Sequence, residues 1–225
     1  MQARDRLVVA ADLSSRDDIL HLVDELRGAV GMFKIGLQAF IANGPSLVRE
    51  IVASGEKVFL DLKIHDIPNT AGHAVAEADA LGASIATVHA SGGEAMLRAC
   101  ANTRALVLGV TILTSLDDDD VERIGFEGSA MESAVRLARL AQGSGLRGVV
   151  ASPHEIASIR EACGDGFVIL TPGIRPAGEN ACDQRRTMTP RDAIRAGADY
   201  IVVGRPITNA KGRREAALQI VDAMA

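Results

Sequence analysis

Eight short apolar runs, each followed by a longer stretch with helical spacing, recur along the whole of this 225-residue chain. Short apolar runs indicate buried strands, and apolar residues three and four positions apart indicate helices. Strands that alternate with helices are typical of a parallel sheet, because neighbouring parallel strands need a long crossover between them. The expected strands are Leu7–Ala11, Met32–Ile35, Val58–Leu62, Ser84–Val88, Leu106–Ile112, Gly148–Ala151, Phe167–Thr171 and Tyr200–Val203. The expected helices are Arg16–Leu26, Pro45–Ser54, Thr70–Leu81, Glu94–Ala101, Ala130–Gly143, Pro153–Ala162, Pro190–Ala196 and Arg213–Met224, and the acidic run Asp117–Asp120 resembles a further helix start.

Eight strand–helix units within 225 residues fit an α/β fold of the (β/α)8 TIM barrel type, at the compact end of its size range. An open doubly wound sheet is the alternative, but the GxGxxG turn that usually follows its first strand is missing here. Only 3% of the residues are aromatic, so Ala, Val, Leu and Ile must build the core, which favours buried parallel strands. The chain has no linker or shift in composition, and we therefore expect one barrel domain over residues 1–225.

Charge and cysteine content limit the partners and the compartment. The net charge is −5 without any basic block, so nucleic acid is not an expected partner, although a local basic pocket could hold a small anion. Three widely spaced cysteines form no CxxC pair or zinc pattern, which is typical of reduced thiols in a cytoplasmic protein. The N-terminus lacks the apolar stretch of a signal peptide, and no window approaches a membrane span. We expect a cytoplasmic protein without membrane contact.

Polar and charged residues stand where the expected strands end. Barrel enzymes place their catalytic groups at the C-terminal ends of the strands, whereas the opposite face serves stability. The first four strands carry, in order, Asp12, Lys34, the pair Asp61 and Lys63, and His89. Solubility is better served by charges on the outer helix faces, so we expect several of these groups to share one charged site.

The third strand carries a carboxylate and an ammonium group two positions apart. Side chains alternate between the faces of a strand, so Asp61 and Lys63 are expected to share one face. The two charges could flank one substrate atom, or they could form a simple ion pair that closes the barrel mouth. The presence of Asp12 and Lys34 on neighbouring strands favours the substrate site.

The stretch DLKIHDIPNT at residues 61–70 resembles the signature of the orotidine 5'-monophosphate decarboxylase family. Further motifs resemble that family and follow its order: VHASGG at 88–93, VTILTS at 110–115, TPGIRP at 171–176, DQRR at 183–186 and VGRP at 203–206. The resemblance extends from roughly residue 6 to residue 210. It implies a (β/α)8 barrel that converts orotidine 5'-monophosphate to uridine 5'-monophosphate (UMP) and CO2, the last step of de novo UMP biosynthesis. It also implies a homodimer that uses no cofactor and no metal.

The resemblance assigns the chemistry to four charged residues. Lys63 corresponds to the family's catalytic lysine, which delivers a proton to C6 of the pyrimidine as CO2 leaves. Asp61 corresponds to the carboxylate beside the departing group, and Lys34 and Asp66 extend the alternating Lys–Asp array. In the family the second aspartate comes from the partner subunit. We therefore expect Asp66 to serve the neighbouring active site across a dimer interface.

Other matched residues are expected around the nucleotide. Asp12 and Thr70 match groups near the ribose hydroxyls, with Thr70 again contributed by the other chain, and Thr114 and Ser115 fall where the pyrimidine edge is read. In barrels the loops after the seventh and eighth strands commonly bind phosphate, and an arginine can grip two phosphate oxygens at once. Residues 173–186 show no helical or strand period and are expected to form a mobile lid. The matched residues in these loops are Pro172, Arg175, Gln184, Gly204 and Arg205.

Two other functions fit parts of the sequence. The pattern Asp–x–Lys–x–x–Asp also occurs in magnesium-dependent lyases that act on keto-sugar phosphates, and His65 and His89 could join Asp61 and Asp66 in a metal cluster. Lys63 within that cluster would repel a cation, so no metal is expected. A barrel that binds a nucleotide without turning it over is the third hypothesis. Buried alternating charges disfavour it, because each costs several kcal/mol of desolvation unless it is well paired.

Overall fold

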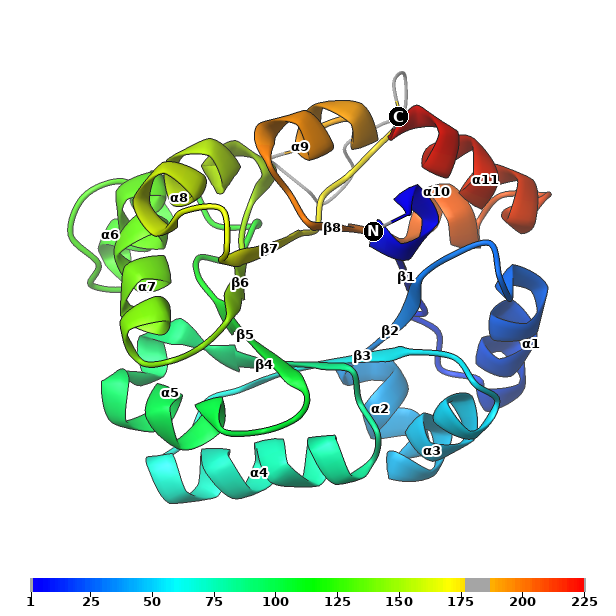
Figure 1. Ribbon diagram of the computed structural model, residues 1–225, viewed down its shortest axis with the longest axis horizontal. Helices are drawn as coiled ribbons and strands as arrows, with labels where there is room; N and C mark the ends of the chain where they lie inside the picture. The colour runs from blue at the N-terminus through cyan, green and yellow to red at the C-terminus, as the bar shows by residue number, and fades with distance from the viewer. Residues whose placement is uncertain (1, 177–186, 225) are drawn as a thin grey trace.

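The computed structural model describes residues 2–176 and 187–224, and its strands form one closed parallel barrel in sequence order. Figure 1 looks down this barrel, with the strands around the centre and the helices outside them. The strands are β1 (Leu7–Ala10), β2 (Met32–Gly36), β3 (Val58–Ile64), β4 (Ile85–His89), β5 (Leu106–Val110), β6 (Gly148–Val150), β7 (Val168–Thr171) and β8 (Tyr200–Val203). The barrel closes where β8 pairs with β1. The predicted (β/α)8 fold is confirmed, and every strand lies within two residues of its expected bounds.

The helices follow the strands around the barrel and include two that the sequence did not predict. The helices are α1 (Arg16–Leu26), α2 (Leu37–Asn43), α3 (Pro45–Ala53), α4 (Pro68–Ala80), α5 (Glu94–Ala101), α6 (Asp118–Arg123), α7 (Ala130–Gly143), α8 (Ile156–Cys163), α9 (Pro190–Ala196), α10 (Arg205–Thr208) and α11 (Arg213–Ala223), with 3-10 turns η1 (Ala3–Arg6), η2 (Ala90–Gly92) and η3 (Pro153–Glu155). The acidic run does begin a helix, with Asp117 as the N-cap of α6. Of these two, α10 has only 4 residues, too few to produce a periodic signal, whereas α2 has 7 residues like α9 but lacks the capping side chain and the proline that mark the start of α9.

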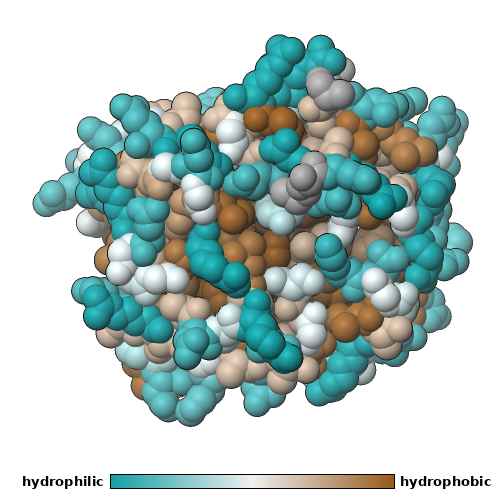
Figure 2. All heavy atoms as spheres, viewed as in Figure 1, coloured by the Kyte–Doolittle hydropathy of each residue, from teal (hydrophilic) through white to brown (hydrophobic). Residues whose placement is uncertain are grey.

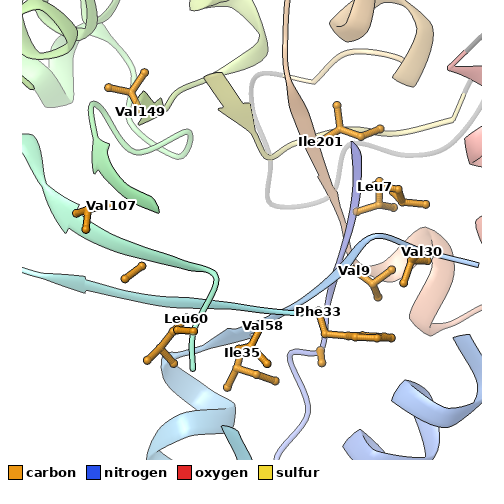
Figure 3. Packing of buried hydrophobic residues seen from close by; sticks show 14 of the residues in the cluster. Leu7, Val9, Val30, Phe33, Ile35, Val58, Leu60, Val107, Val149 and Ile201 are labelled. Carbon is orange, nitrogen blue, oxygen red and sulfur yellow. The ribbon is translucent and has the colours of Figure 1, made fainter. Parts of the chain in front are cut away.

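Strand side chains alternate between two apolar layers. Outward-facing residues such as Val9, Phe33 and Leu60 pack between the strands and the helices, as Figure 3 shows. Inward-facing residues fill the barrel itself, and these are Val8, Ala10, Met32, Phe59, Ile85, Leu108, Val110, Val150, Leu170 and Val202. Burial of both faces explains why the strands read as continuous apolar runs in the sequence.

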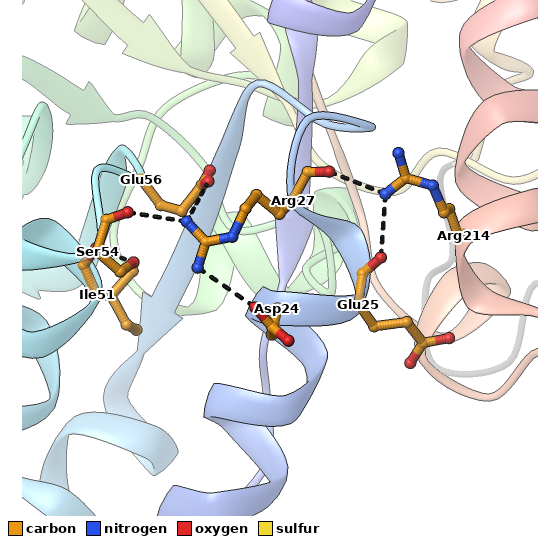
Figure 4. Close-up of polar contacts among 7 residues, drawn as sticks. All are labelled: Asp24, Glu25, Arg27, Ile51, Ser54, Glu56 and Arg214. Carbon is orange, nitrogen blue, oxygen red and sulfur yellow. Dashed lines mark hydrogen bonds and ion pairs between the residues drawn. The ribbon is translucent and has the colours of Figure 1, made fainter.

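The first and last helices of the ring are connected by arginine hydrogen bonds (Figure 4). Arg214 of α11 donates to the carbonyl oxygens of Glu25 and Arg27 at the end of α1, at 3.2 and 2.8 Å. The Arg27 side chain donates to the carbonyl oxygen of Ser54, after α3, at 2.8 Å, and to the Glu56 carboxylate at 3.4 Å. Because carbonyls at a helix end lack partners within the helix, these contacts satisfy them and join α11, α1 and α3.

The face of the molecule seen in Figure 1 is hydrophilic around most of its edge, with hydrophobic residues visible nearer its centre (Figure 2). Several large apolar side chains of the described residues are nevertheless exposed, most of all Ile41 of α2 at 78% and Ile67, just before α4, at 67%. In the described part of the chain, no helix is both long and apolar enough to cross a membrane.

Candidate active site

A cavity of about 540 Å³ opens at the carboxyl ends of the barrel strands. Its apolar floor is the upper part of the inner core, formed by residues such as Phe59, Val110 and Leu170. Its rim is polar and includes most of the residues singled out from the sequence: Asp12, Lys34, Asp61, Lys63, Thr114, Pro172, Arg175, Gly204 and Arg205. A cavity with an apolar floor and a few convergent charges is typical of a small-molecule site.

The charged side chains on the first three strands form one continuous array. Lys63 Nζ lies 2.9 Å from Asp61 Oδ2, and Lys34 Nζ lies 3.9 Å from the same oxygen. Lys34 Nζ also pairs with Asp12 Oδ1 at 2.7 Å. The Asp61 and Lys34 side chains are only 11% and 12% exposed, so solvent screens their attraction weakly. The structure thus joins Asp12, Lys34, Asp61 and Lys63 in one array of alternating charge, whereas Asp66, which the resemblance placed in the array, is not part of it within this chain.

The backbone of β3 departs from the regular alternation expected for Asp61 and Lys63. Lys63 has a φ of +52°, in the left-handed region that residues with a Cβ rarely adopt. The pairing of β3 with β4 also shifts between Leu60 and Ile64. Lys63 therefore reaches Asp61 from a bulged strand rather than from a regular one.

Thr87 of β4 contacts both members of the Asp61–Lys63 pair, and the sequence reasoning did not single it out. Its hydroxyl donates to Asp61 Oδ1 at 3.0 Å and accepts from the backbone N–H of Lys63 at 2.9 Å. Thr87 is fully buried. Its sequence signal is weak: Thr87 is a polar residue between the apolar Ala86 and Val88 of β4, and no local pattern shows which residues it contacts.

Gly36, at the end of β2, was also missed. A Cβ at this position would lie 2.9 Å from Lys34 Nζ and 3.1 Å from Asp12 Oδ1. The absence of a side chain therefore leaves room for the Lys34–Asp12 ion pair. Nothing in the sequence separates this glycine from one that only ends a strand.

The loops after β7 and β8 form the other side of the cavity. Gly173 follows β7 with a φ of +77°, a conformation that favours glycine. Arg175 and Arg205 both line the cavity, Arg205 being the first residue of α10. Thr208 and Asn209 line it as well and were not predicted. These side chains offer two cations and several hydrogen-bonding groups to one end of a ligand.

The start of the expected lid, residues 173–186, is joined by backbone contacts to Met188, just beyond its end. Ile174 and Met188 form an isolated parallel bridge, and the N–H of Arg175 donates to the carbonyl oxygen of Met188 at 3.0 Å. The segment 177–186, which includes Gln184, lies outside the described residues.

Among the predicted site residues that the structure describes, three do not line the cavity. Ser115 is exposed beyond Thr114. Asp66 and Thr70 belong to a stretch at 65–70 in which every residue is exposed, and the Asp66 carboxylate accepts from the N–H of Ile67 at 2.7 Å. Asp66 and Ile67 help to line a separate, shallow surface hollow. Within this chain, Asp66 is thus kept apart from the Asp61–Lys63 pair.

The two histidines near the site lie beside each other. The rings of His65 and His89 are 5.4 Å apart. Burial lowers the pKa of His89, with the neighbouring His65 and Lys63 acting in the same direction, and this favours the neutral imidazole. Across residues 2–176 and 187–224, no three His, Cys, Asp or Glu side chains gather closely enough to hold a metal ion.

The closed barrel and the charged cavity at the carboxyl ends of its strands define the class of (β/α)8-barrel enzymes. The sequence of this chain matches the family model of the orotidine 5'-phosphate decarboxylase / HUMPS family over residues 5–220. Orotidine 5'-phosphate decarboxylase of Heliobacterium modesticaldum is 48% identical over 237 residues, covering 100% of this chain and 98% of that protein. Its counterpart in Geobacter sulfurreducens is 47% identical over 230 residues, covering 98% of this chain and 96% of the relative.

Solved structures resemble the whole barrel. The crystal structure of orotidine 5'-phosphate decarboxylase from Lactobacillus acidophilus has a TM-score of 0.87 and 34% identity, covering 97% of this chain and 98% of that one. An uncharacterized conserved protein from Geobacillus kaustophilus has a TM-score of 0.85 and 32% identity, with coverages of 97% and 100%. The chain belongs to the orotidine 5'-phosphate decarboxylase / HUMPS family.

Proposed function

We propose that this protein is an orotidine 5'-phosphate decarboxylase, which converts orotidine 5'-monophosphate to UMP and CO2 in pyrimidine biosynthesis. Relatives of that name match the chain at 44–48% identity over nearly its full length. The observation that carries the proposal is the array Asp12–Lys34–Asp61–Lys63 above an apolar floor. Such an array suits a reaction that develops negative charge on a carbon atom of a flat heterocyclic ring.

The proposed chemistry is cofactor-free and electrostatic. The bond between C6 and the carboxylate breaks, CO2 leaves, and the electron pair stays in an sp² orbital of C6 that the ring cannot delocalise. The Lys63 ammonium stabilises this charge, donates a proton to C6, and is reprotonated from solvent. A fixed ammonium needs little reorganisation as the charge develops, because Asp61 already orients it at 2.9 Å.

Asp61 has a second proposed role, since its carboxylate would lie next to that of the substrate. Like charges in a poorly screened site disfavour the bound substrate relative to the transition state. Reactions of this difficulty need a barrier reduction of roughly 20 kcal/mol or more, which no single pair supplies. Binding energy from the ribose and phosphate must therefore contribute. Asp12 is proposed to contact the ribose, Lys34 to extend the charged array beside Asp61, and Thr114 to contact the edge of the pyrimidine.

The phosphate is proposed to bind between the loops after β7 and β8, where Arg175 and Arg205 line the cavity. Replacing Arg205 with Ala should raise KM and weaken UMP binding by about 10- to 100-fold, because a hydrogen bond to a charged group contributes about 1.5–3 kcal/mol. Steady-state kinetics and UMP titration measure both effects. Arg98→Ala, on the outer helix α5, is the matched control and should leave them unchanged. An unaltered KM in Arg205→Ala would show that Arg205 does not bind the phosphate.

The active unit is proposed to be a homodimer in which Asp66 and Thr70 complete the partner's site. The exposed stretch 65–70, with Ile67 at 67% exposure, supports this proposal, because large apolar side chains are often covered by a partner. Asp66 lies outside the cavity of its own subunit, as expected for a residue that contributes to the active site of the partner subunit.

Shared sites predict complementation between two inactive variants. Asp66→Ala and Lys63→Ala homodimers should each be inactive, whereas a refolded equimolar mixture should regain about a quarter of wild-type activity. Random pairing makes half of the dimers mixed, and each mixed dimer has one intact site. Activity is measured before and after mixing, with each variant refolded alone as the control. A mixture no more active than its components would show that the two residues do not belong to sites shared between subunits.

An ultraviolet assay of orotidine 5'-monophosphate loss, with and without EDTA, tests the function itself. The expected result is turnover at equal rates in both samples, with UMP as the product. Turnover that EDTA abolishes and Mg²⁺ restores would support a magnesium-dependent lyase and contradict the cofactor-free mechanism. Nucleotide binding without turnover would favour a binding protein.

A further inference from the structure

We propose that Thr87 is a positioning residue that fixes the backbone of Lys63 and the carboxylate of Asp61 in one reactive geometry. The proposal rests on the proposed function and extends it, because it concerns how the Asp61–Lys63 pair is held rather than what the pair does. It follows from three features of the barrel interior: a distorted β3, a buried hydroxyl on β4, and the division of the Asp61 oxygens between different donors.

The distortion of β3 withdraws Lys63 from the regular strand ladder. β3 pairs with β4 through Leu60 and Ala86, and then through Ile64 and Val88. Four steps along β3 thus correspond to two steps along β4, and Lys63 lies in the bulged part with a φ of +52°. A left-handed conformation is unfavourable for a residue with a Cβ, so it persists only where neighbouring contacts hold it.

The Thr87 hydroxyl supplies such a contact. The N–H of Lys63 donates to Thr87 Oγ1 at 2.9 Å, in place of a carbonyl of the neighbouring strand. The hydroxyl has a single proton, and it donates that proton to Asp61 Oδ1 at 3.0 Å. Both roles of the hydroxyl are therefore in use, and its orientation is fixed from two sides. Because Thr87 is fully buried, water does not compete for either bond.

The same hydroxyl divides the two oxygens of Asp61 between different partners. Oδ1 accepts from Thr87, whereas Oδ2 faces Lys63 Nζ at 2.9 Å and Lys34 Nζ at 3.9 Å. A carboxylate held at one oxygen cannot rotate freely about its χ2 angle. Thr87 thus controls both ends of the Lys63 residue, its backbone directly and its ammonium group through Asp61. Loss of the hydroxyl should misplace Lys63 without removing any charge from the site.

The test compares Thr87→Val, which removes the hydroxyl at nearly constant shape, with Thr87→Ser, which keeps it. In Thr87→Val, kcat for orotidine 5'-monophosphate should fall about 10- to 100-fold, because small misplacements of a reacting group have effects of that size. KM and UMP affinity should change by less than about 3-fold, since the phosphate and ribose contacts remain. Thr87→Ser should retain a kcat within about 3-fold of wild type.

Thr111→Val is the control for loss of a buried hydroxyl near the same end of the barrel. Thr111 is buried, and its hydroxyl donates to the carbonyl oxygen of Val150 at 3.1 Å rather than to the charged array. This variant should lose thermal stability with little change in kcat. If Thr87→Val does not fold, Thr87→Ala and Thr87→Ser are compared at a temperature where both are folded, as judged by circular dichroism and UMP binding.

The outcomes separate this proposal from the proposed function. A wild-type protein without decarboxylase activity would contradict the proposed function. An active wild type whose Thr87→Val variant keeps its full kcat would overturn the positioning role alone. Equal losses of kcat in Thr87→Ser and Thr87→Val would also overturn it, because they would assign the effect to packing. A loss in Thr87→Val with rescue in Thr87→Ser supports it.

Discussion

Replacement of Lys63 with Ala is expected to lower kcat for orotidine 5'-monophosphate by at least about 10⁴-fold, since it removes a general acid and a preorganised cation together. Alanine keeps a Cβ, so the left-handed backbone at this position costs about the same in the variant and the wild type. The loss of rate then reports the missing ammonium group. Affinity for UMP should fall far less, because the phosphate contacts remain.

The fold should tolerate the Lys63→Ala change. Asp61 keeps the hydrogen bond from Thr87 and the nearby charge of Lys34 at 3.9 Å, so its carboxylate is not left without compensation. Lys57→Ala is the matched control, because Lys57 is exposed at the opposite, N-terminal end of the same strand. The control should keep wild-type kcat. Substantial turnover by a folded Lys63→Ala variant would show that a group other than Lys63 donates the proton.

Replacement of Gly148 with Ala is expected to destabilise the barrel by about 3 kcal/mol, near the upper end of overpacking effects. Gly148 begins β6 and pairs with Leu108 and Val168 on either side. A Cβ here would lie 2.3 Å from the carbonyl oxygen of Val168 and 2.8 Å from Leu108 Cδ2. The carbonyl cannot move without opening the β6–β7 ladder. The inner core therefore has no space for even one methyl group at this position.

Thermal unfolding measures the Gly148 effect, which should appear as a decrease in Tm of roughly 10 °C for a chain of this size. Gly143→Ala is the control, because Gly143 ends α7 and a Cβ there meets no heavy atom within 4 Å. That substitution should be neutral or stabilise the protein by up to about 1 kcal/mol, since Ala has the higher helix propensity. Equal Tm values for the two variants would contradict the packing argument.

The fold was predictable because its signals are local and repeated. Each strand is buried on both faces, so its apolar run stands out, and each long helix adds its own periodicity. The four-residue α10 is too short to give such a signal, and α2 was missed because it lacks the start signals of α9, a helix of the same length. As a result, Arg205 was expected in an open loop, whereas it lies at the first position of the short helix α10.

The site residues were predictable where they lie at or near the carboxyl end of a strand, because these strand ends surround the cavity. Asp12, Lys34, Asp61 and Lys63 follow that rule, and the structure joins them in a single array. Thr87 was not found, because its partners are residues of the neighbouring strand, and the pairing depends on a bulge that no local pattern shows.

The sequence by itself determined the eight-fold alternation of strands and helices, the family motifs and the set of charges at the strand ends, because each depends on residue type and spacing along the chain. Only the tertiary structure decided which charges touch and how Lys63 is held. It also decided that Asp66 does not line the cavity that holds Asp61 and Lys63. The physical reason is that register shifts, a left-handed residue and hydrogen bonds between strands arise from packing around the closed barrel, where residues distant in sequence meet.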